Sequence, residues 1–438
     1  MVEKISLITL GCDKNLVDSE LILGTLKKEG YSFTENIKEA NVIIVNTCGF
    51  IKAAKEESLN TLKKIAAQKK NNKNVFLIAA GCLAKLLGEE IKNEIPEIDA
   101  IIGSGDLYKL PGIIKNRNRT IEISDHSHLI YYNEKDRILS DAVSANLKIA
   151  EGCDNCCSYC VIPRIKGKYK SRDMESIIRE ARYLVSKGVK EINIIAQDIT
   201  FYGKDLYGKF SLSELLKRIT EIPGDFWIRL LYAYPSYIDD QLIETIAESE
   251  KIVKYLDIPL QHVNDRILKL MGRKTSSREI KILFSKLRQT IPDIALRTTF
   301  IVGFPSEKKE DFEELKNFIW TYQIDRVGAF KYSKEEGTLA YHYRLHLSEK
   351  IKEQRYEELM KVQKLISKII NKRFIGKKLK VLIEGYINER NLFFGRSYRD
   401  SKNVDGVVFV KGNNIKIGEF VDVIIKEAYY YDLYGEKV

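Results

Sequence analysis

The chain has 438 residues, of which 44% are hydrophobic and 30% charged, a composition typical of a globular protein of about three domains. Its formal net charge of +11 suits an anionic partner such as RNA, or only a solvated lysine-rich surface. No stretch approaches the roughly 18 uninterrupted apolar residues of a membrane span and no signal-peptide pattern opens the chain, so we expect a cytoplasmic protein whose 7 cysteines are ligands and not disulfides.

The N-terminal region, residues 1–114, alternates short apolar strands with amphipathic helices. This alternation predicts an α/β domain with a doubly wound parallel sheet and helices on both faces. We expect strands at 4–10, 41–47, 75–80 and 100–103, and helices at 18–29, 53–68 and 83–93.

Three cysteines directly follow the first three of these predicted strands. They are Cys12, Cys48 and Cys82, and each is adjacent to a glycine that permits close backbone approach. Because neighbouring parallel strands end at one edge of a sheet, the fold brings the three thiols onto one crevice, where ligand sites form. The pattern therefore favours a three-thiolate metal site, with three buried structural cysteines as the alternative.

Residues 115–141 are polar and of mixed charge, which predicts a linker with at most one strand. His126 and His128 have a spacing that would suit a metal, although we expect ordinary surface residues.

Residues 142–345 resume the strand-helix alternation. Six strand-helix units predict a parallel barrel that is left partly open, with functional groups at the carboxyl ends of its strands. The expected strands are 147–150, 191–197, 227–232, 255–260, 295–302 and 327–332.

The loop after the first barrel strand holds four cysteines within eight residues, at 153, 156, 157 and 160. Two Cys-x-x-Cys pairs without a spacer are poorly suited to a zinc site, which normally separates its pairs by a dozen or more residues. Cys153, Cys157 and Cys160 instead form a Cys-x-x-x-Cys-x-x-Cys loop that would wrap three thiolates around one iron-sulfur cluster. A zinc knuckle or a packed cysteine cluster is the alternative.

This loop, with Tyr159 before its last cysteine, resembles that of the radical S-adenosylmethionine (SAM) enzymes. The resemblance implies a 4Fe-4S cluster on Cys153, Cys157 and Cys160, with one open iron that binds SAM. In that family an electron from the cluster cleaves SAM to a deoxyadenosyl radical, which abstracts hydrogen from carbon. Cys156 is an additional thiol that we expect to be a bystander.

SAM needs groups that hold its carboxylate, ribose and adenine. Tyr159, Gln197 and Arg297 are chemically suited to such contacts, or are ordinary hydrogen-bonded barrel residues. His262 follows another strand, and we expect it to have a structural or substrate-orienting role and not to act as a base.

Residues 346–372 predict a helix at 349–371 that is capped by Ser348. We expect its apolar side to consist of Ile351, Leu359, Leu365, Ile366 and Ile369. Residues 361 to 380 hold eight lysines or arginines and no acid, which favours either docking on a polyanion or a solvated helix end.

Residues 373–438 predict a small antiparallel β-barrel with strands at 380–386, 392–398, 406–410 and 421–428, which resembles a TRAM domain. Basic and aromatic groups mix there and suit either RNA stacking or contact with a protein substrate. They are Arg396, Arg399, Tyr429, Tyr430, Tyr431 and Tyr434.

The whole chain resembles the methylthiotransferases, a branch of the radical SAM enzymes. The N-terminal resemblance rests on residues 11–20, 46–50, 54–58 and 81–82, and it implies a second 4Fe-4S cluster on Cys12, Cys48 and Cys82 that delivers sulfur, which the family first methylates with another SAM. Residues 12–15, Cys-Asp-Lys-Asn, and 258–262, Ile-Pro-Leu-Gln-His, look like the RimO type, whereas MiaB-type tRNA enzymes show Gln-Met-Asn after the first cysteine. Lys166 stands where an arginine is usual.

The RimO-type resemblance implies methylthiolation of an aspartate β-carbon in small-subunit ribosomal protein twelve, free or within the subunit, with a flavodoxin or ferredoxin as electron donor. RNA contact would come from the basic helix and the TRAM-like domain. Two alternatives stay open, namely a MiaB-type tRNA-adenosine methylthiotransferase and a non-enzymatic iron-sulfur or zinc protein that binds RNA.

Overall fold

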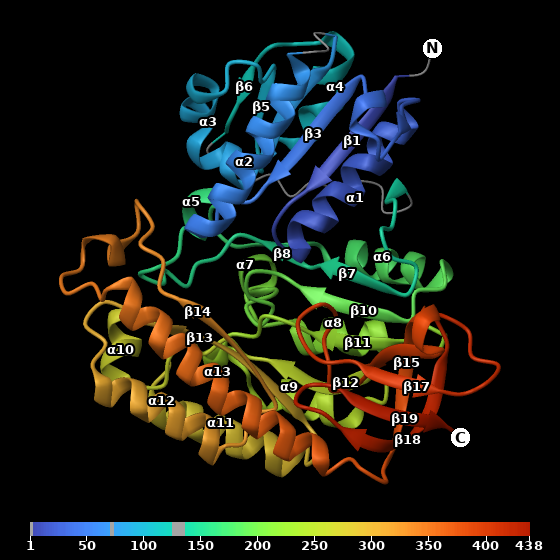
Figure 1. The fold of residues 1–438 in the computed structure, drawn as a ribbon, viewed down its shortest axis with the longest axis vertical. Helices are drawn as coiled ribbons and strands as arrows, with labels where there is room; N and C mark the ends of the chain where they lie inside the picture. The colour runs from blue at the N-terminus through green and yellow to red at the C-terminus, as the bar shows by residue number, and fades with distance from the viewer. Residues whose placement is uncertain (1–2, 71–73, 125–135) are drawn as a thin grey trace.

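The computed structural model describes residues 3–70, 74–124 and 136–438, which form three lobes in chain order (Figure 1). An N-terminal α/β lobe lies at the top of the view, a central lobe below it, and a small β-barrel at the lower right against the central lobe. His126 and His128 lie outside the described residues. None of the helices in those ranges is both long and apolar enough to cross a bilayer.

The N-terminal lobe is a doubly wound parallel sheet, as predicted, with strand order β2-β1-β3-β4-β5-β6. Apolar side chains of α2 and α3 pack on one face, and those of α1 and α4 pack on the other. The sequence missed β2 because a two-residue edge strand carries no periodicity, whereas β6 is the one strand allowed for within residues 115–141. The elements are β1 (Lys4–Thr9), α1 (Asp13–Lys28), β2 (Ser32–Phe33), β3 (Val42–Thr47), α2 (Lys52–Lys69), β4 (Phe76–Gly81), α3 (Cys82–Glu94), β5 (Ala100–Gly103), α4 (Leu110–Asn116) and β6 (Ile121–Glu122).

Helix α1 begins at Asp13, five residues before the predicted start at 18. Its first turn was missed because the buried side chains there are polar, namely Lys14 and Asn15. An amphipathic pattern cannot reveal a helix whose inward side chains are charged or amide-bearing. The early start places Cys12 at the N-cap and the residues that follow it on the first turn of the helix.

The central lobe is an open parallel sheet of order β14-β13-β12-β11-β10-β7, which confirms the predicted partial barrel. One large apolar cluster joins its strands to the covering helices. The strands are β7 (Ser144–Lys148), β10 (Glu191–Ile195), β11 (Trp227–Leu230), β12 (Ile252–Asp257), β13 (Ala295–Val302) and β14 (Arg326–Lys331). The helices include α6 (Met174–Ser186), α8 (Leu212–Thr220), α9 (Asp240–Glu248), α10 (Asp265–Leu270), α11 (Ser277–Thr290) and α12 (Lys309–Thr321).

Helix α13 (Glu349–Lys372) crosses the outer side of β14 beside α12 (Figure 1). Its predicted apolar side is correct at Leu359 and Ile366 and wrong at three exposed positions, Ile351, Leu365 and Ile369. The buried stripe also contains polar Gln363, whose amide donates to the carbonyl oxygen of Ile324 at 3.0 Å. Because the buried stripe includes polar residues, the apolar residues of α13 indicated a different side of the helix from the one that is buried.

The C-terminal lobe is a closed five-stranded barrel of order β15-β16-β17-β19-β18. The prediction of a purely antiparallel barrel is wrong at one pair, because β17 and β19 run parallel. Strand β19 was not predicted, since its polar residues show little alternation. The strands are β15 (Lys378–Ile387), β16 (Leu392–Ser397), β17 (Val408–Lys411), β18 (Phe420–Ala428) and β19 (Leu433–Lys437).

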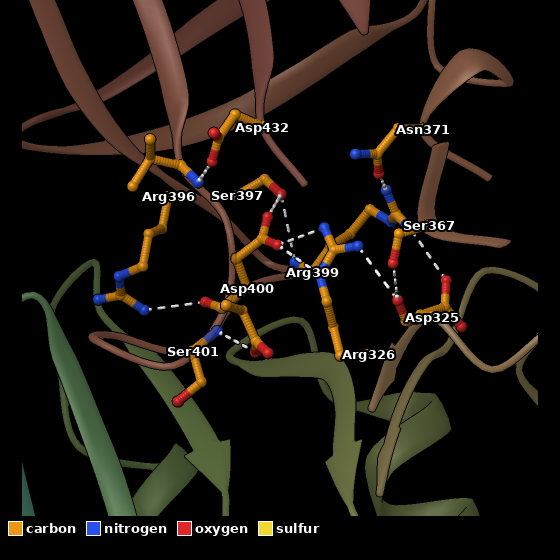
Figure 2. Close-up of polar contacts among 12 residues, drawn as sticks. Asp325, Arg326, Ser367, Asn371, Arg396, Ser397, Arg399, Asp400, Ser401 and Asp432 are labelled. Atoms are coloured by element: carbon orange, nitrogen blue, oxygen red, sulfur yellow. Dashed lines mark hydrogen bonds and ion pairs between the residues drawn. The ribbon is translucent and has the colours of Figure 1, made fainter. Parts of the chain in front are cut away.

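Buried ion pairs hold this barrel against the central sheet. Arg396 and Arg399 are each only 1% exposed, so the prediction that they contact RNA or substrate is wrong. Figure 2 shows Arg399 directed at Asp325, with an Nη2–Oδ1 distance of 2.8 Å. Arg396 pairs with Glu191 at 2.5 Å. These arginines therefore join two lobes, while the tyrosines at 429 to 431 remain exposed.

Candidate active site

The structure brings Cys12, Cys48 and Cys82, here called the N-terminal trio, to one edge of the N-terminal sheet. Cys12 caps α1 and Cys82 is the first residue of α3, so two thiols sit at helix N-termini, where negative charge is favoured. Gly11 has φ +92°, and a Cβ there would lie 2.7 Å from the Cβ of Cys48. Only glycine permits this approach of the first loop to the second.

Asn15 ties the three cysteine loops together. Its Nδ2 donates to the carbonyl oxygens of Leu10 at 3.0 Å and Thr47 at 3.2 Å, which precede Cys12 and Cys48. The Sγ of Cys82 lies 3.6 Å from its Oδ1. One buried amide thus positions all three thiols, a role that the sequence did not reveal.

Burial disfavours the thiolate form of two members of the N-terminal trio, Cys48 and Cys82. It raises the pKa of Cys48 and raises that of Cys82 to about 12. Such a thiol is deprotonated when a metal binds its sulfur, and the proton is released to solvent. In the described part of the chain, no group of three His, Cys, Asp or Glu side chains surrounds one ion position. Three thiols are the donor set that holds iron-sulfur clusters.

Cys153, Cys157 and Cys160, here called the barrel trio, lie on the loop after β8 (Ala150–Glu151). Loop residues are fixed to the barrel: Asn155 Nδ2 donates to Asp198 Oδ2 at 2.7 Å, and Ser158 N donates to the carbonyl of Met271 at 2.9 Å. Burial raises the pKa of Cys153 to about 12 and also raises that of Cys160. Cys156 is exposed and has φ +51°.

Arg273 is a site residue that the sequence did not predict. Its Nη1 lies 3.9 Å from the Sγ of Cys157, and its Nη2 donates to the carbonyl of Pro259 at 2.7 Å. The guanidinium carbon lies 4.0 Å from the ring centroid of Tyr234. Arg273 follows α10 in a turn without a motif, so only the tertiary fold shows that its charge can stabilise anionic sulfur.

The three residues predicted to contact SAM lie in different surroundings. Gln197 follows β10 and donates to Glu151 at 2.7 Å, while its buried Oε1 has no hydrogen-bond partner among the described residues. Tyr159 packs edge-on against Phe304, with a centroid distance of 6.4 Å. The contacts of both with SAM stay predictions.

Arg297, the third of these residues, is paired with Asp257 of β12 at 2.8 Å and with Asp405 of the C-terminal lobe at 3.5 Å. Its guanidinium is therefore already bound by two carboxylates, and its contact with SAM also stays a prediction. Burial lowers the pKa of His262 to about 3, so this imidazole is neutral at physiological pH, and its Nδ1 accepts from the amide of Asn264 at 3.0 Å.

A buried contact joins the elements that carry the two trios. Helix α5 (Ile162–Lys166), which follows Cys160, places Ile165 in an apolar cluster with Cys82 at the start of α3. Lys166, the residue that departs from the usual arginine, pairs with Asp18 of α1 at 3.4 Å and with Glu151 at 3.5 Å. Lys148 of β7 pairs with the same two carboxylates. This four-charge cluster fixes the N-terminal lobe on the barrel.

The first turn of α1 reaches the carboxyl edge of the barrel. Tyr232, which follows β11 and has φ +66°, donates from its hydroxyl to Asp13 Oδ2 at 3.2 Å. The Nζ of Lys14 lies 3.2 Å from the centroid of the same ring. Residues of both lobes thus meet beside Cys12, where chemistry that needs both trios would take place.

Family comparisons cover all three lobes. Residues 4–103 match the uncharacterized protein family UPF0004, residues 147–319 the radical SAM superfamily, and residues 375–438 the TRAM domain. The chain is 50% identical to the ribosomal protein uS12 methylthiotransferase RimO of Clostridium botulinum, covering 99% of this chain and 97% of that protein. It is 47% identical to that of Thermoanaerobacter sp., covering 99% and 100%.

Solved structures share the fold at low sequence identity. The radical SAM methyltransferase TsrM from Kitasatospora setae aligns with a TM-score of 0.55 at 13% identity, over 76% of this chain and 72% of that chain. The cobalamin-dependent SAM radical enzyme OxsB aligns with a TM-score of 0.53 at 13% identity, over 84% and 56%. Both likenesses concern the fold alone.

Proposed function

Because the chain belongs to the RimO family of ribosomal protein uS12 methylthiotransferases, which are radical SAM enzymes, we propose that it adds a methylthio group to the β-carbon of an aspartate in uS12. The family resemblance predicted from the sequence is thereby confirmed. The observation that supports the proposal is a buried lobe interface formed by the elements that carry the two cysteine trios. Such an arrangement suits a reaction in which hydrogen removal and sulfur delivery act on one carbon.

Membership of the radical SAM superfamily brings a 4Fe-4S cluster and SAM. We assign that cluster to the barrel trio and a second, auxiliary 4Fe-4S cluster to the N-terminal trio, in the domain matched as UPF0004. When bound, these groups would supply the one-electron chemistry that removes hydrogen from carbon, and the sulfur that, methylated by a further SAM, replaces it. The electron would come from a small carrier such as a flavodoxin or ferredoxin.

The protein's own contribution is to hold and shield these groups. Asn15 fixes the loops of the N-terminal trio, and Arg273 places a positive charge beside Cys157. Lys166 and Asp18, both buried, form an ion pair across the lobe interface. Rigid placement matters because a displacement of the reacting groups by about 1 Å can lower the reaction rate about 100-fold.

An exposed basic surface suggests how the substrate is presented. Lys364 and Lys368 of α13 lie 4.2 and 4.7 Å from the ring centroid of Tyr430 in the C-terminal lobe. Basic groups beside an exposed aromatic ring are typical of RNA contacts. This supports docking on ribosomal RNA when uS12 is modified within the small subunit.

The function is tested by anaerobic reconstitution followed by mass spectrometry of uS12, small subunits and bulk tRNA. The wild type should add one methylthio group to uS12. Replacing the N-terminal trio by alanines should abolish this product while SAM cleavage continues, and replacing the barrel trio should abolish both. Modification of tRNA in place of uS12, or zinc in place of iron, would contradict the proposal.

A further inference from the structure

The Lys14 side chain is buried without an anionic partner. It is 8% exposed, and within residues 3–70, 74–124 and 136–438 its ammonium makes neither a hydrogen bond nor an ion pair. Its close neighbour is the ring of Tyr232, with Nζ 3.2 Å from the centroid. Because a largely buried ammonium gains free energy from a hydrogen-bonded anion, this position suits an anionic ligand.

The carboxylates around Lys14 are bound to other groups. The groups that interact with Lys14 electrostatically are Cys12, which precedes it by two residues, and the carboxylates of Asp13, Glu151 and Asp257. Each carboxylate has a closer partner: Asp13 accepts from the Tyr232 hydroxyl at 3.2 Å, Glu151 pairs with Lys148 at 2.8 Å, and Asp257 pairs with Arg297 at 2.8 Å. The protein therefore surrounds Lys14 with negative charge at a distance but leaves the ammonium's own hydrogen bonds free.

Lys14 lies at a position that suits substrate binding, because residues of both lobes lie around it. Lys14 lies on the first turn of α1, two residues after Cys12 of the N-terminal trio. Tyr232 lies beyond β11, at the carboxyl edge of the barrel that also carries the barrel trio. Its left-handed backbone, at φ +66°, is strained for a tyrosine and directs the ring beneath Lys14.

We propose that Lys14 binds the side-chain carboxylate of the substrate aspartate, an inference that rests on the proposed function. In aspartate the β-carbon is bonded directly to the carboxylate carbon. An ammonium that binds the carboxylate therefore holds the reacting β-carbon, which is one bond from the carboxylate carbon, beside Cys12. The charge also makes Lys14 a specificity-determining residue, since a neutral side chain of the same shape would leave the ammonium unpaired.

The test compares binding of uS12 peptides to reconstituted holoenzyme, measured anaerobically with SAM by fluorescence anisotropy. One peptide carries the target aspartate and its match carries asparagine there. The wild type should bind the aspartate peptide about 10- to 100-fold more tightly, the range of one charge-assisted hydrogen bond. Lys14→Met should lose this preference, whereas Lys14→Arg should retain part of it.

Two further variants separate recognition from folding. Lys27→Met removes an exposed lysine from the same helix and should keep the full aspartate preference. Lys14→Gln should lose it as Lys14→Met does, with iron content and thermal midpoint measured for each. An undiminished aspartate preference in both Lys14→Met and Lys14→Gln overturns this assignment even if the wild type modifies uS12. A wild type that modifies only tRNA overturns the proposed function instead.

Discussion

Replacing Glu191 by glutamine should destabilise the contact between the central sheet and the C-terminal barrel. Glu191 is fully buried and accepts from Arg229 Nε at 2.9 Å and from Arg396 Nη2 at 2.5 Å. The substitution leaves two buried guanidinium groups without their shared counter-ion. Removing one partner of a buried ion pair costs about 3–5 kcal/mol.

The titration of Glu191 leads to a similar magnitude. Burial by itself raises the pKa of this carboxyl, but the charges of Arg396 and Arg229 outweigh it and lower the pKa from 4.5 to about 2. At about 1.4 kcal/mol per unit this shift corresponds to roughly 3 kcal/mol. Because the folded pKa is the lower one, this stability is present above about pH 4.5 and is lost as pH falls towards 2.

Urea unfolding followed by tryptophan fluorescence provides the assay. Trp227 of β11 contacts Phe420 of β18 across this interface, with ring centroids 4.7 Å apart, and Trp320→Phe in the background isolates its signal. Glu191→Gln should lower the free energy of unfolding by about 3 kcal/mol at pH 7 and flatten its decline below pH 4.5. Glu389→Gln, an exposed change in the C-terminal lobe away from this interface, should stay within about 0.5 kcal/mol of the wild type. A loss below about 1 kcal/mol for Glu191→Gln would refute the reasoning.

Three other changes test the site. Asn15→Ala should reduce reconstituted iron from the content of two clusters to that of one, because the loops of the N-terminal trio lose a shared amide; unchanged iron would contradict this role. Arg273→Gln should make the midpoint potential of the barrel cluster more negative in a redox titration, since a positive charge beside Cys157 is lost, whereas exposed Lys274→Gln should leave it near the wild-type value. Lys364→Glu with Lys368→Glu should weaken binding to small subunits at least about 10-fold and reduce its salt dependence, while modification of free uS12 continues; equal loss on both substrates would exclude RNA docking.

The architecture was largely predictable because its signals are local. Strand-helix alternation depends on residues a few positions apart, so both parallel sheets were readable from the sequence. The exceptions have a common cause. The first turns of α1 and the inner stripe of α13 are buried through polar side chains such as Asn15 and Gln363, whose partners lie on other elements. Hydrophobic periodicity carries no information on such contacts.

The candidate site divides in the same way. Cysteine identity and spacing indicated the barrel trio directly, and the rule that parallel strands end at one edge predicted that Cys12, Cys48 and Cys82 would converge. Arg273 and Lys14 were not assigned roles, because an isolated basic residue has no local pattern. Arg396 was misassigned to a partner surface for the same reason, although it is buried against Glu191.

The sequence by itself determined which atoms can bind metal, in what order the domains occur, and to which enzymes the chain is related. Only the tertiary structure decided which charges are neutralised and which are left open. Lys166 and Arg396 have their carboxylates, whereas Lys14 has none within reach in the described residues. The physical reason is that the energy of a charge depends on its burial and on distances across lobes, which the linear order of residues does not contain.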